Sequence, residues 1–185
     1  MEKKIIVDID NTLWDLAPVL WEYLKALNAS MPPPSQWTYW DICEDYVPPR
    51  ELFRALRDIH SQQDIYVPYP EAKPFLLALK EKGFQITIAS HREEGTLDPT
   101  ARWLHKHDLV FDEIHLSRDK SVLFDHHFAI IDDSPVTLEK AARAGIVRAG
   151  LIEPWNKGTD HPLFHNLNEI LMYIDSQWAF TRSKF

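Results

Sequence analysis

The sequence predicts an α/β fold with a parallel sheet of about five strands, helices on both faces and a small helical cap inserted after the first strand. Short β-branched runs alternate with stretches of helical periodicity, which is the pattern of repeated βαβ units. The length of 185 residues corresponds to one ordinary domain, and 45% hydrophobic residues are enough for a core. A proline- and aromatic-rich segment between the first two strands interrupts the alternation, which indicates the insertion.

Local signals place each element. The first strand is the run Ile5-Ile6-Val7, which leads into Asp8 and Asp10. Further strands are expected at 84–89, 113–116, 128–131 and 146–152, and helices at about 15–27, 50–60, 71–82, 98–107, 135–144 and 166–177. Expected N-caps are Asp15, Asp98 and Ser134, and expected helix stops are Gly83 and Gly145. With right-handed crossovers, these elements give a Rossmann-like sheet.

The insertion is expected to form its own unit. Residues 16–70 would be a small helical cap, whereas residues 1–15 and 71–185 would form the core domain. The insertion contains several aromatic residues, namely Trp37, Tyr39, Trp40 and Tyr66. These rings either pack into a small core of the insertion or line a pocket for a flat ligand, and the sequence leaves both alternatives open.

Composition restricts the partners and the location. The formal net charge of −8 argues against a nucleic-acid polymer as partner, although a local pocket for a small phosphate is compatible with it. The single cysteine, Cys43, cannot form an internal disulfide, and the apolar run near the N-terminus is too short for a signal peptide or a membrane span. We therefore expect a cytoplasmic protein without a membrane partner, either a monomer or a homodimer. The nine histidines show no zinc-ligand spacing, and most are expected at the surface.

Side chains able to carry chemistry follow four predicted strands. They are Asp8 and Asp10 after the first strand, Ser90 at the end of the second, Lys120 after the third, and Asp132-Asp133 after the fourth. Each has an ordinary structural explanation by itself, such as a solvated charge or a helix-side hydrogen bond. The carboxyl ends of parallel strands, however, share one edge, where open α/β sheets bind ligands. Four acids at one edge require positive charge, and a hard divalent cation such as Mg²⁺ together with Lys120 would supply it.

These motifs resemble those of the haloacid dehalogenase-like hydrolases. The resemblance consists of D-x-D-x-T at residues 8–12, the serine at 90, the lysine at 120 and D-D at 132–133, and it covers the whole chain. Residues 130–135, Pro154-Trp155-Asn156 and the insertion are similar to the 5'(3')-deoxyribonucleotidase-like branch of this superfamily. Residues 10–14 also resemble the magnesium-dependent phosphatase branch, which lacks a sizeable insertion. Nucleotidases of the first branch usually carry a Gly-Val pair where this chain has Asn11-Thr12.

The resemblance implies a role for each residue. Asp8 would be the nucleophile that forms an aspartyl-phosphate, and Asp10 would protonate the leaving oxygen and then activate water. Ser90 and Lys120 would complete the catalytic set by binding the transferring phosphoryl group. The implied metal site comprises Asp8, Asp10 through its backbone carbonyl, Asp132, and Asp133 as support. The residues expected to contact the substrate are Asn11, Thr12, Ser90, His91, Arg92, Lys120 and Trp40.

The implied activity is that of a Mg²⁺-dependent phosphoric monoester hydrolase of the 5'-nucleotidase type. Its substrate would be a small phosphorylated metabolite, namely a nucleoside or deoxynucleoside monophosphate. Two alternatives stay open: a magnesium-dependent phosphatase for sugar or protein phosphates, and a member that binds phosphate without hydrolysing it. A receiver module is disfavoured because its acceptor aspartate ends the third strand, where this chain has Ser117. A kinase is disfavoured because the five glycines form no phosphate-binding loop motif.

Overall fold

A computed structural model describes residues 3–183 of the chain and contains a six-stranded parallel sheet. The strand order is β3-β2-β1-β4-β5-β6, and every neighbouring pair is parallel. The strands are β1 (Lys4–Val7), β2 (Gln85–Ser90), β3 (Glu113–Leu116), β4 (Ala129–Ile131), β5 (Val147–Leu151) and β6 (Leu163–Phe164). The predicted α/β class is confirmed. The expected number of strands was one too low, because the two-residue β6 has no β-branched run to signal it.

Within residues 3–183, six α-helices and five short 3₁₀ segments accompany the strands. The α-helices are α1 (Ala17–Leu27), α2 (Pro49–Ser61), α3 (Ala72–Glu81), α4 (Leu97–Lys106), α5 (Pro135–Ala144) and α6 (Leu167–Arg182). The 3₁₀ segments are η1 (Pro34–Gln36), η2 (Ile42–Asp45), η3 (Gln63–Ile65), η4 (Glu94–Thr96) and η5 (Lys120–His126). Ser134 caps α5 as predicted, because its hydroxyl accepts a hydrogen bond from the Thr137 amide.

Three predicted helix ends were wrong. The α4 helix begins at Leu97, before the expected cap at Asp98. Asp15 does not cap α1; the side chain of Asn11 does so instead, as described below. The α6 helix continues past residue 177 to Arg182, where the sequence suggested a loose tail. The Trp178 ring explains this extension, because it packs edge-on against Phe128 with the ring centroids 4.9 Å apart.

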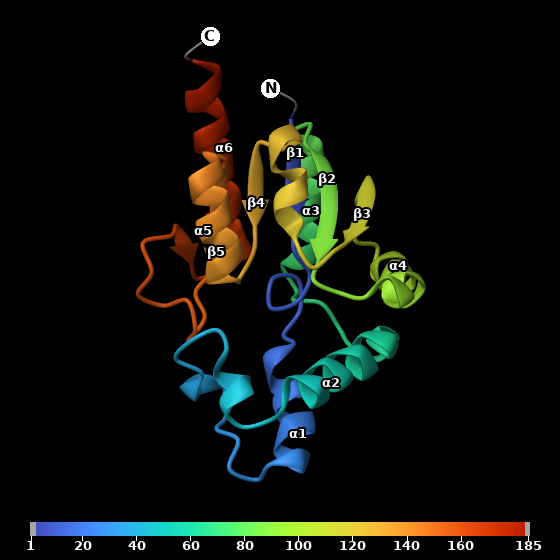
Figure 1. Cartoon of the computed structure of the whole chain (residues 1–185). Helices are drawn as coiled ribbons and strands as arrows, with labels where there is room; N and C mark the ends of the chain where they lie inside the picture. The colour runs from blue at the N-terminus through green and yellow to red at the C-terminus, as the bar shows by residue number, and fades with distance from the viewer. Residues whose placement is uncertain (1–2, 184–185) are drawn as a thin grey trace.

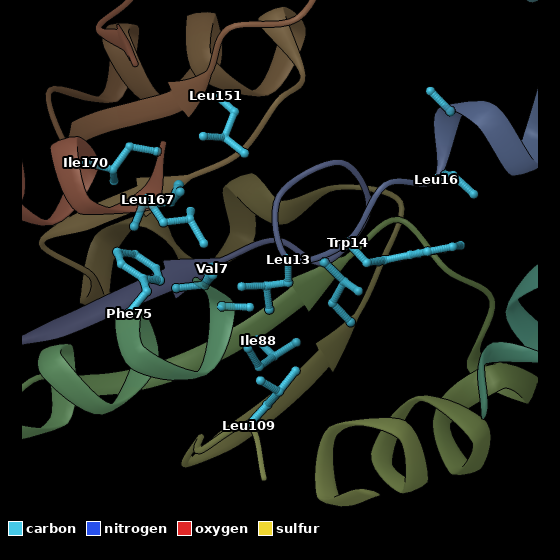
Figure 2. Close-up of a cluster of buried hydrophobic side chains, with 14 of the residues drawn as sticks. Val7, Leu13, Trp14, Leu16, Phe75, Ile88, Leu109, Leu151, Leu167 and Ile170 are labelled. Carbon is cyan, nitrogen blue, oxygen red and sulfur yellow. The ribbon is translucent and has the colours of Figure 1, made fainter. Parts of the chain in front are cut away.

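The sheet is covered on both faces. Ile5 and Val7 of β1 face one large cluster, which Phe75 of α3 and Leu167 and Ile170 of α6 complete (Figure 2). The intervening Ile6 points to the opposite face, where a second cluster includes Phe124 of η5 and Ala141 of α5. Burying each large apolar side chain contributes roughly 1.5–3 kcal/mol. The central strand β1, which carries the first two acids, is therefore fixed from both sides.

The segment of residues 16–70, here called the inserted segment, holds α1, η1, η2, α2 and η3. Figure 1 shows α1 and α2 beyond the carboxyl ends of the strands, at a distance from the layers formed by the sheet and α3, α5 and α6. Leu24 of α1 and Ile59 of α2 are fully buried and belong to the large cluster. None of the described helices has the length and hydrophobicity of a transmembrane segment.

Candidate active site

The sheet register brings acids from two distant parts of the chain together. Val7 at the end of β1 pairs with Ile131 at the end of β4, so Asp8 and Asp132 follow neighbouring strands at the same level. The Asp8 amide donates a hydrogen bond to the Ile131 carbonyl at 2.9 Å, which extends the ladder to the first acid. Both carboxylates are almost fully buried, with 3% and 1% relative exposure. Such groups require partners of opposite charge.

Lys120 is the cation that these two acids share. Its Nζ lies 2.5 Å from Asp8 Oδ1 and 2.7 Å from Asp132 Oδ2, and its side chain is buried. Burial by itself would lower the pKa of Lys120, but the charges of Asp132 and Asp8 raise it, so the ammonium stays charged. The lysine opens η5, whose N-cap Asp119 accepts a hydrogen bond from the Ser121 amide. The sequence placed Lys120 in a polar loop, and the structure brings it to the centre of the site.

A third acid leaves the cluster short of positive charge. Carboxylate oxygens of Asp8, Asp132 and Asp133 all lie within 4.8 Å of one another. Burial, followed by the charges of Asp8 and Asp132, raises the pKa of Asp133 well above its usual range. Burial, together with the neighbouring Asp132 and Asp10, likewise raises the pKa of Asp8 to about 7 despite Lys120. Three buried oxygen ligands with one lysine fit a hard divalent cation such as Mg²⁺.

The side chain of Asp10 belongs to a separate setting that is rich in hydrogen-bond donors and includes one arginine. Its Oδ2 accepts from Arg92 Nε and Ser90 Oγ, each at 3.1 Å, and Trp14 Nε1 donates to Oδ1 at 2.9 Å. His60 Nε2 of α2 lies 3.3 Å from Oδ2. Burial would raise the pKa of Asp10, but Arg92 and His60 hold it well below its usual range. The Asp10 carboxylate is therefore ionised, and it ties the core to the inserted segment.

Asn11 links the start of the inserted segment to the acid cluster. Its Oδ1 accepts from the amides of Leu16 and Ala17 at 3.1 and 3.0 Å, and so caps α1. Its Nδ2 donates to Asp133 Oδ2 at 3.1 Å. The residue adopts a left-handed backbone conformation with φ of 55°, which asparagine tolerates better than most residues. All of its side-chain polar atoms are thus engaged within the protein.

A cavity of about 340 Å³ opens over these groups. Its floor is polar and consists of core residues, including Asp8, Ser90, Lys120 and the two acids after β4. Its walls come largely from the inserted segment, with Trp37, Tyr39 and Trp40 among them. Trp155 of the core completes the wall, and its ring centroid lies 6.1 Å from that of Trp37 and 6.4 Å from that of Trp40. The size falls within the range of small-molecule pockets.

The substrate contacts expected from the sequence divide between this pocket and its surroundings. Those that line the pocket are Asn11, Ser90, His91, Lys120 and Trp40. Arg92 and Thr12 do not line it: Arg92 is buried and donates to Asp10 and Thr100, and Thr12 is fully buried. Of the four aromatic residues of the inserted segment considered in the sequence, Trp37, Tyr39 and Trp40 line the pocket. Tyr66 does not line it and instead stacks on Trp14, with the ring centroids 4.8 Å apart.

No protein-family model matches the sequence, and no curated protein matches it significantly. Solved structures do match the fold. A haloacid dehalogenase-like family hydrolase from Streptococcus pneumoniae has a TM-score of 0.62 at 18% identity, covering 93% of this chain and 98% of that one. A predicted phosphoglycolate phosphatase from Haemophilus somnus has a TM-score of 0.62 at 19% identity, covering 93% and 97%. A haloacid dehalogenase-superfamily hydrolase of subfamily IA from Geobacter sulfurreducens has a TM-score of 0.59 at 16% identity, covering 94% and 96%.

The chain has the haloacid dehalogenase-like fold. We expected from the sequence that the acids after β1 and β4 meet at the carboxyl edge of the sheet. The structure brings them together there, since both Asp8 and Asp132 accept hydrogen bonds from Lys120. Sequence reasoning missed His60, Trp14 and Trp155 as members or neighbours of the site. His60 occupies the last turn of an amphipathic helix and is buried at 4% exposure, where a surface histidine was the default expectation. Only its contact with Asp10, 50 positions earlier in the chain, reveals its place.

Proposed function

We propose that this protein is a Mg²⁺-dependent phosphatase that hydrolyses small phosphate monoesters through an aspartyl-phosphate on Asp8. The observation that carries the proposal is the buried lysine shared by acids from two neighbouring strands, with a third acid beside them. Such an arrangement combines a nucleophile with charge that can stabilise a phosphoryl group in transfer. The neighbouring structures named above, a phosphoglycolate phosphatase among them, support the same reading through their shared fold.

The acids would hold the metal as follows. Asp8, Asp132 and Asp133 offer clustered carboxylate oxygens, and the backbone carbonyl of Asp10 is the further ligand expected from the sequence. A bound Mg²⁺ would supply positive charge beside the transferring oxygens. Lys120 would contribute a second positive charge, and the Ser90 hydroxyl, which donates to Asp10 Oδ2 in the structure, would turn to donate its hydrogen bond to the phosphoryl group. Removing either acid after β4 would weaken the metal site while leaving the nucleophile in place.

The proposed reaction has two displacements at phosphorus. A carboxylate oxygen of Asp8 attacks phosphorus, the bond to the leaving oxygen breaks, and that oxygen takes up a proton. Water then attacks the phosphorus of the aspartyl-phosphate, the bond to Asp8 breaks, and inorganic phosphate leaves. Asp10 would give the first proton and take the second. Its carboxylate is ionised as the structure holds it, so the acid role requires it first to gain a proton, which loosening its contacts with Arg92 or His60 would favour.

We propose nucleoside or deoxynucleoside monophosphates as substrates, with the inserted segment as a cap over the active site. The aromatic wall formed by Trp37, Tyr39, Trp40 and Trp155 would contact the base, since flat rings pack well against one another. The proposal gives Arg92 the role of holding Asp10 in position. A cytoplasmic location is part of the proposal and rests on the single, buried thiol of Cys43.

A substrate panel tests this function. The purified protein would be incubated with Mg²⁺ and a set of monophosphates that includes nucleotides, sugar phosphates, a phosphopeptide and p-nitrophenyl phosphate, and released phosphate would be measured. We expect release from nucleotides, and loss of release by several orders of magnitude in Asp8→Asn. Release from no member of the panel would refute the phosphatase proposal, and preference for sugar phosphates or the phosphopeptide would refute the nucleotide assignment.

A further inference from the structure

The walls of the pocket differ in composition from its floor. The floor contains Lys120, which is committed to Asp8 and Asp132. The wall formed by the inserted segment contributes aromatic and aliphatic side chains and two acids, Asp41 and Glu44, which lie at and within η2. The wall therefore offers hydrogen-bond acceptors and negative charge beside flat apolar surfaces.

Basic side chains are scarce around the leaving-group space. Among the residues that line the pocket, Lys120 is the single lysine or arginine, and His60 and His91 are the histidines. His60 is turned to Asp10, and neither Asp41 nor Glu44 has an ion pair with a described residue. Arg118 contacts the pocket residue Phe53, with the guanidinium carbon 5.9 Å from the ring centroid, but it does not itself line the pocket. A second anionic group on the substrate would thus find little to neutralise it.

The floor adds to this effect. With a divalent cation bound, Lys120, Arg92 and the cation would carry four positive charges against four carboxylates, and a phosphate dianion would bring two further negative charges. The loaded floor would then keep a net negative charge, and so would the wall. A carboxylate on the leaving group would be repelled from both directions, whereas N–H donors would be attracted by Asp41 and Glu44.

We propose that the pocket selects a flat leaving group that carries N–H donors and no negative charge, and that Asp41 and Glu44 enforce this choice. This inference rests on the proposed phosphatase function and specifies its substrate class. Among nucleotides, bases with an exocyclic amino group are preferred over bases with a carbonyl at the same position. Among other monoesters, those whose leaving group bears a carboxylate, as glycolate does, are rejected. Because Asp41 and Glu44 are exposed, the discrimination is moderate, about tenfold in kcat/KM.

Two matched substrate pairs test the proposal. Deoxycytidine and deoxyuridine monophosphates differ at C4, which carries an amino group with two N–H donors in the first and a carbonyl in the second, and at N3, which is an acceptor in the first and a single N–H donor in the second. The phosphate esters of 4-hydroxybenzamide and 4-hydroxybenzoate differ by a neutral amide, which donates N–H bonds, and a carboxylate. We expect the first member of each pair to have the higher kcat/KM, and added salt to narrow the second difference because it screens repulsion.

Variants assign the effect to the two acids. In Asp41→Asn/Glu44→Gln, we expect kcat/KM for the benzoate ester to rise about fivefold to tenfold while that of the benzamide ester changes little. The matched control is Glu22→Gln/Asp58→Asn, which removes two acids of the inserted segment that do not line the pocket. The control should keep the wild-type ratio.

The outcomes separate the two proposals. If the wild-type protein hydrolyses no monoester with Mg²⁺, the proposed function fails. If it hydrolyses the benzamide and benzoate esters equally well, or if the double variant keeps the wild-type ratio, the phosphatase proposal stands and the charge selection by Asp41 and Glu44 is overturned. Arg118→Ala serves as a further check: a fall in benzoate ester turnover would show that this arginine recruits anionic leaving groups, against the proposal.

Discussion

Arg92 donates from Nε to Oδ2 of Asp10 at 3.1 Å, and its guanidinium is completely buried in this contact. The arginine follows the second strand, whereas the acid follows the first, so the pair joins neighbouring ends of the sheet. His60 approaches the same carboxylate from the inserted segment. The ionised acid therefore connects three parts of the chain at the floor of the pocket.

Replacing Arg92 by glutamine should destabilise the protein by about 3 kcal/mol at neutral pH, because it leaves a carboxylate that is only 15% exposed without its main cation. The lowered pKa of Asp10 sets the pH dependence. The contribution of the ionised Asp10 to the free energy of unfolding is fully present above pH 3.8 and is lost as the pH falls from 3.8 through the lowered pKa. Urea unfolding at pH 7 and pH 3 measures both effects. An equal difference between variant and wild type at the two pH values would contradict the role of this pair.

Asp8→Asn should stabilise the metal-free protein while abolishing turnover. The pKa of Asp8 is raised from 3.8 to about 7. The contribution of this residue to the free energy of unfolding therefore falls as the pH rises from 3.8 to 7, whereas asparagine does not titrate and makes no such pH-dependent contribution. We expect the variant to gain roughly 1–3 kcal/mol at pH 8 in EDTA and little at pH 4. Urea unfolding in EDTA at both pH values is the measurement. A variant less stable than wild type at pH 8 would show that burial and the neighbouring carboxylates do not destabilise the ionised form of Asp8.

Mg²⁺ should stabilise the wild-type protein against unfolding. A ligand present at 100 times its dissociation constant and bound only by the folded state adds about 2.7 kcal/mol. A titration followed by thermal unfolding should show this gain, reduced in Asp133→Asn. Asp175→Asn, which alters an exposed pair with Lys82, is the control and should respond like wild type. An unchanged response in Asp133→Asn would remove this residue from the metal site.

Gly150 of β5 should not tolerate a methyl group. A Cβ atom there would lie 2.4 Å from the backbone carbonyl oxygen of Asp132, so Gly150→Ala must displace the strand end that carries this acid. We expect a loss of about 1–3 kcal/mol in unfolding free energy, together with weaker Mg²⁺ binding. Gly95→Ala is the control, because a Cβ at Gly95 meets no atom within 4 Å. Equal unfolding free energies and equal Mg²⁺ binding in the two variants would show that a methyl group at position 150 does not displace Asp132.

The fold and the acid cluster could be predicted from the sequence because both depend on local patterns. β-branched runs mark the strands, and parallel pairing then brings their carboxyl ends to one edge, which is why Asp8 and Asp132 meet. Once β1 and β4 are neighbours and Val7 pairs with Ile131, the next residues, Asp8 and Asp132, lie beside each other. Strand β6 was not predicted, because its two residues are too few to show the alternation that marks a strand.

The surroundings of Asp10 could not be predicted in this way. Arg92 and His60 reach it from 82 and 50 positions away, and no local pattern fixes where a long side chain ends. Asn11 was expected to contact the substrate, and it lines the pocket, but no local pattern indicated that its side chain also caps α1 and donates to Asp133. The wall of the pocket depends on how the inserted segment lies over the sheet, which is a tertiary property.

Trapping the covalent intermediate tests the central claim most directly. The protein would be mixed with substrate and Mg²⁺, quenched, reduced with borohydride and digested, and the peptide that contains Asp8 would be sequenced by mass spectrometry. Reduction of an aspartyl-phosphate converts the residue to homoserine, so we predict homoserine at position 8 only when substrate and Mg²⁺ are both present. Turnover without this product, or homoserine at Asp10 or Asp132 in place of Asp8, would contradict the account.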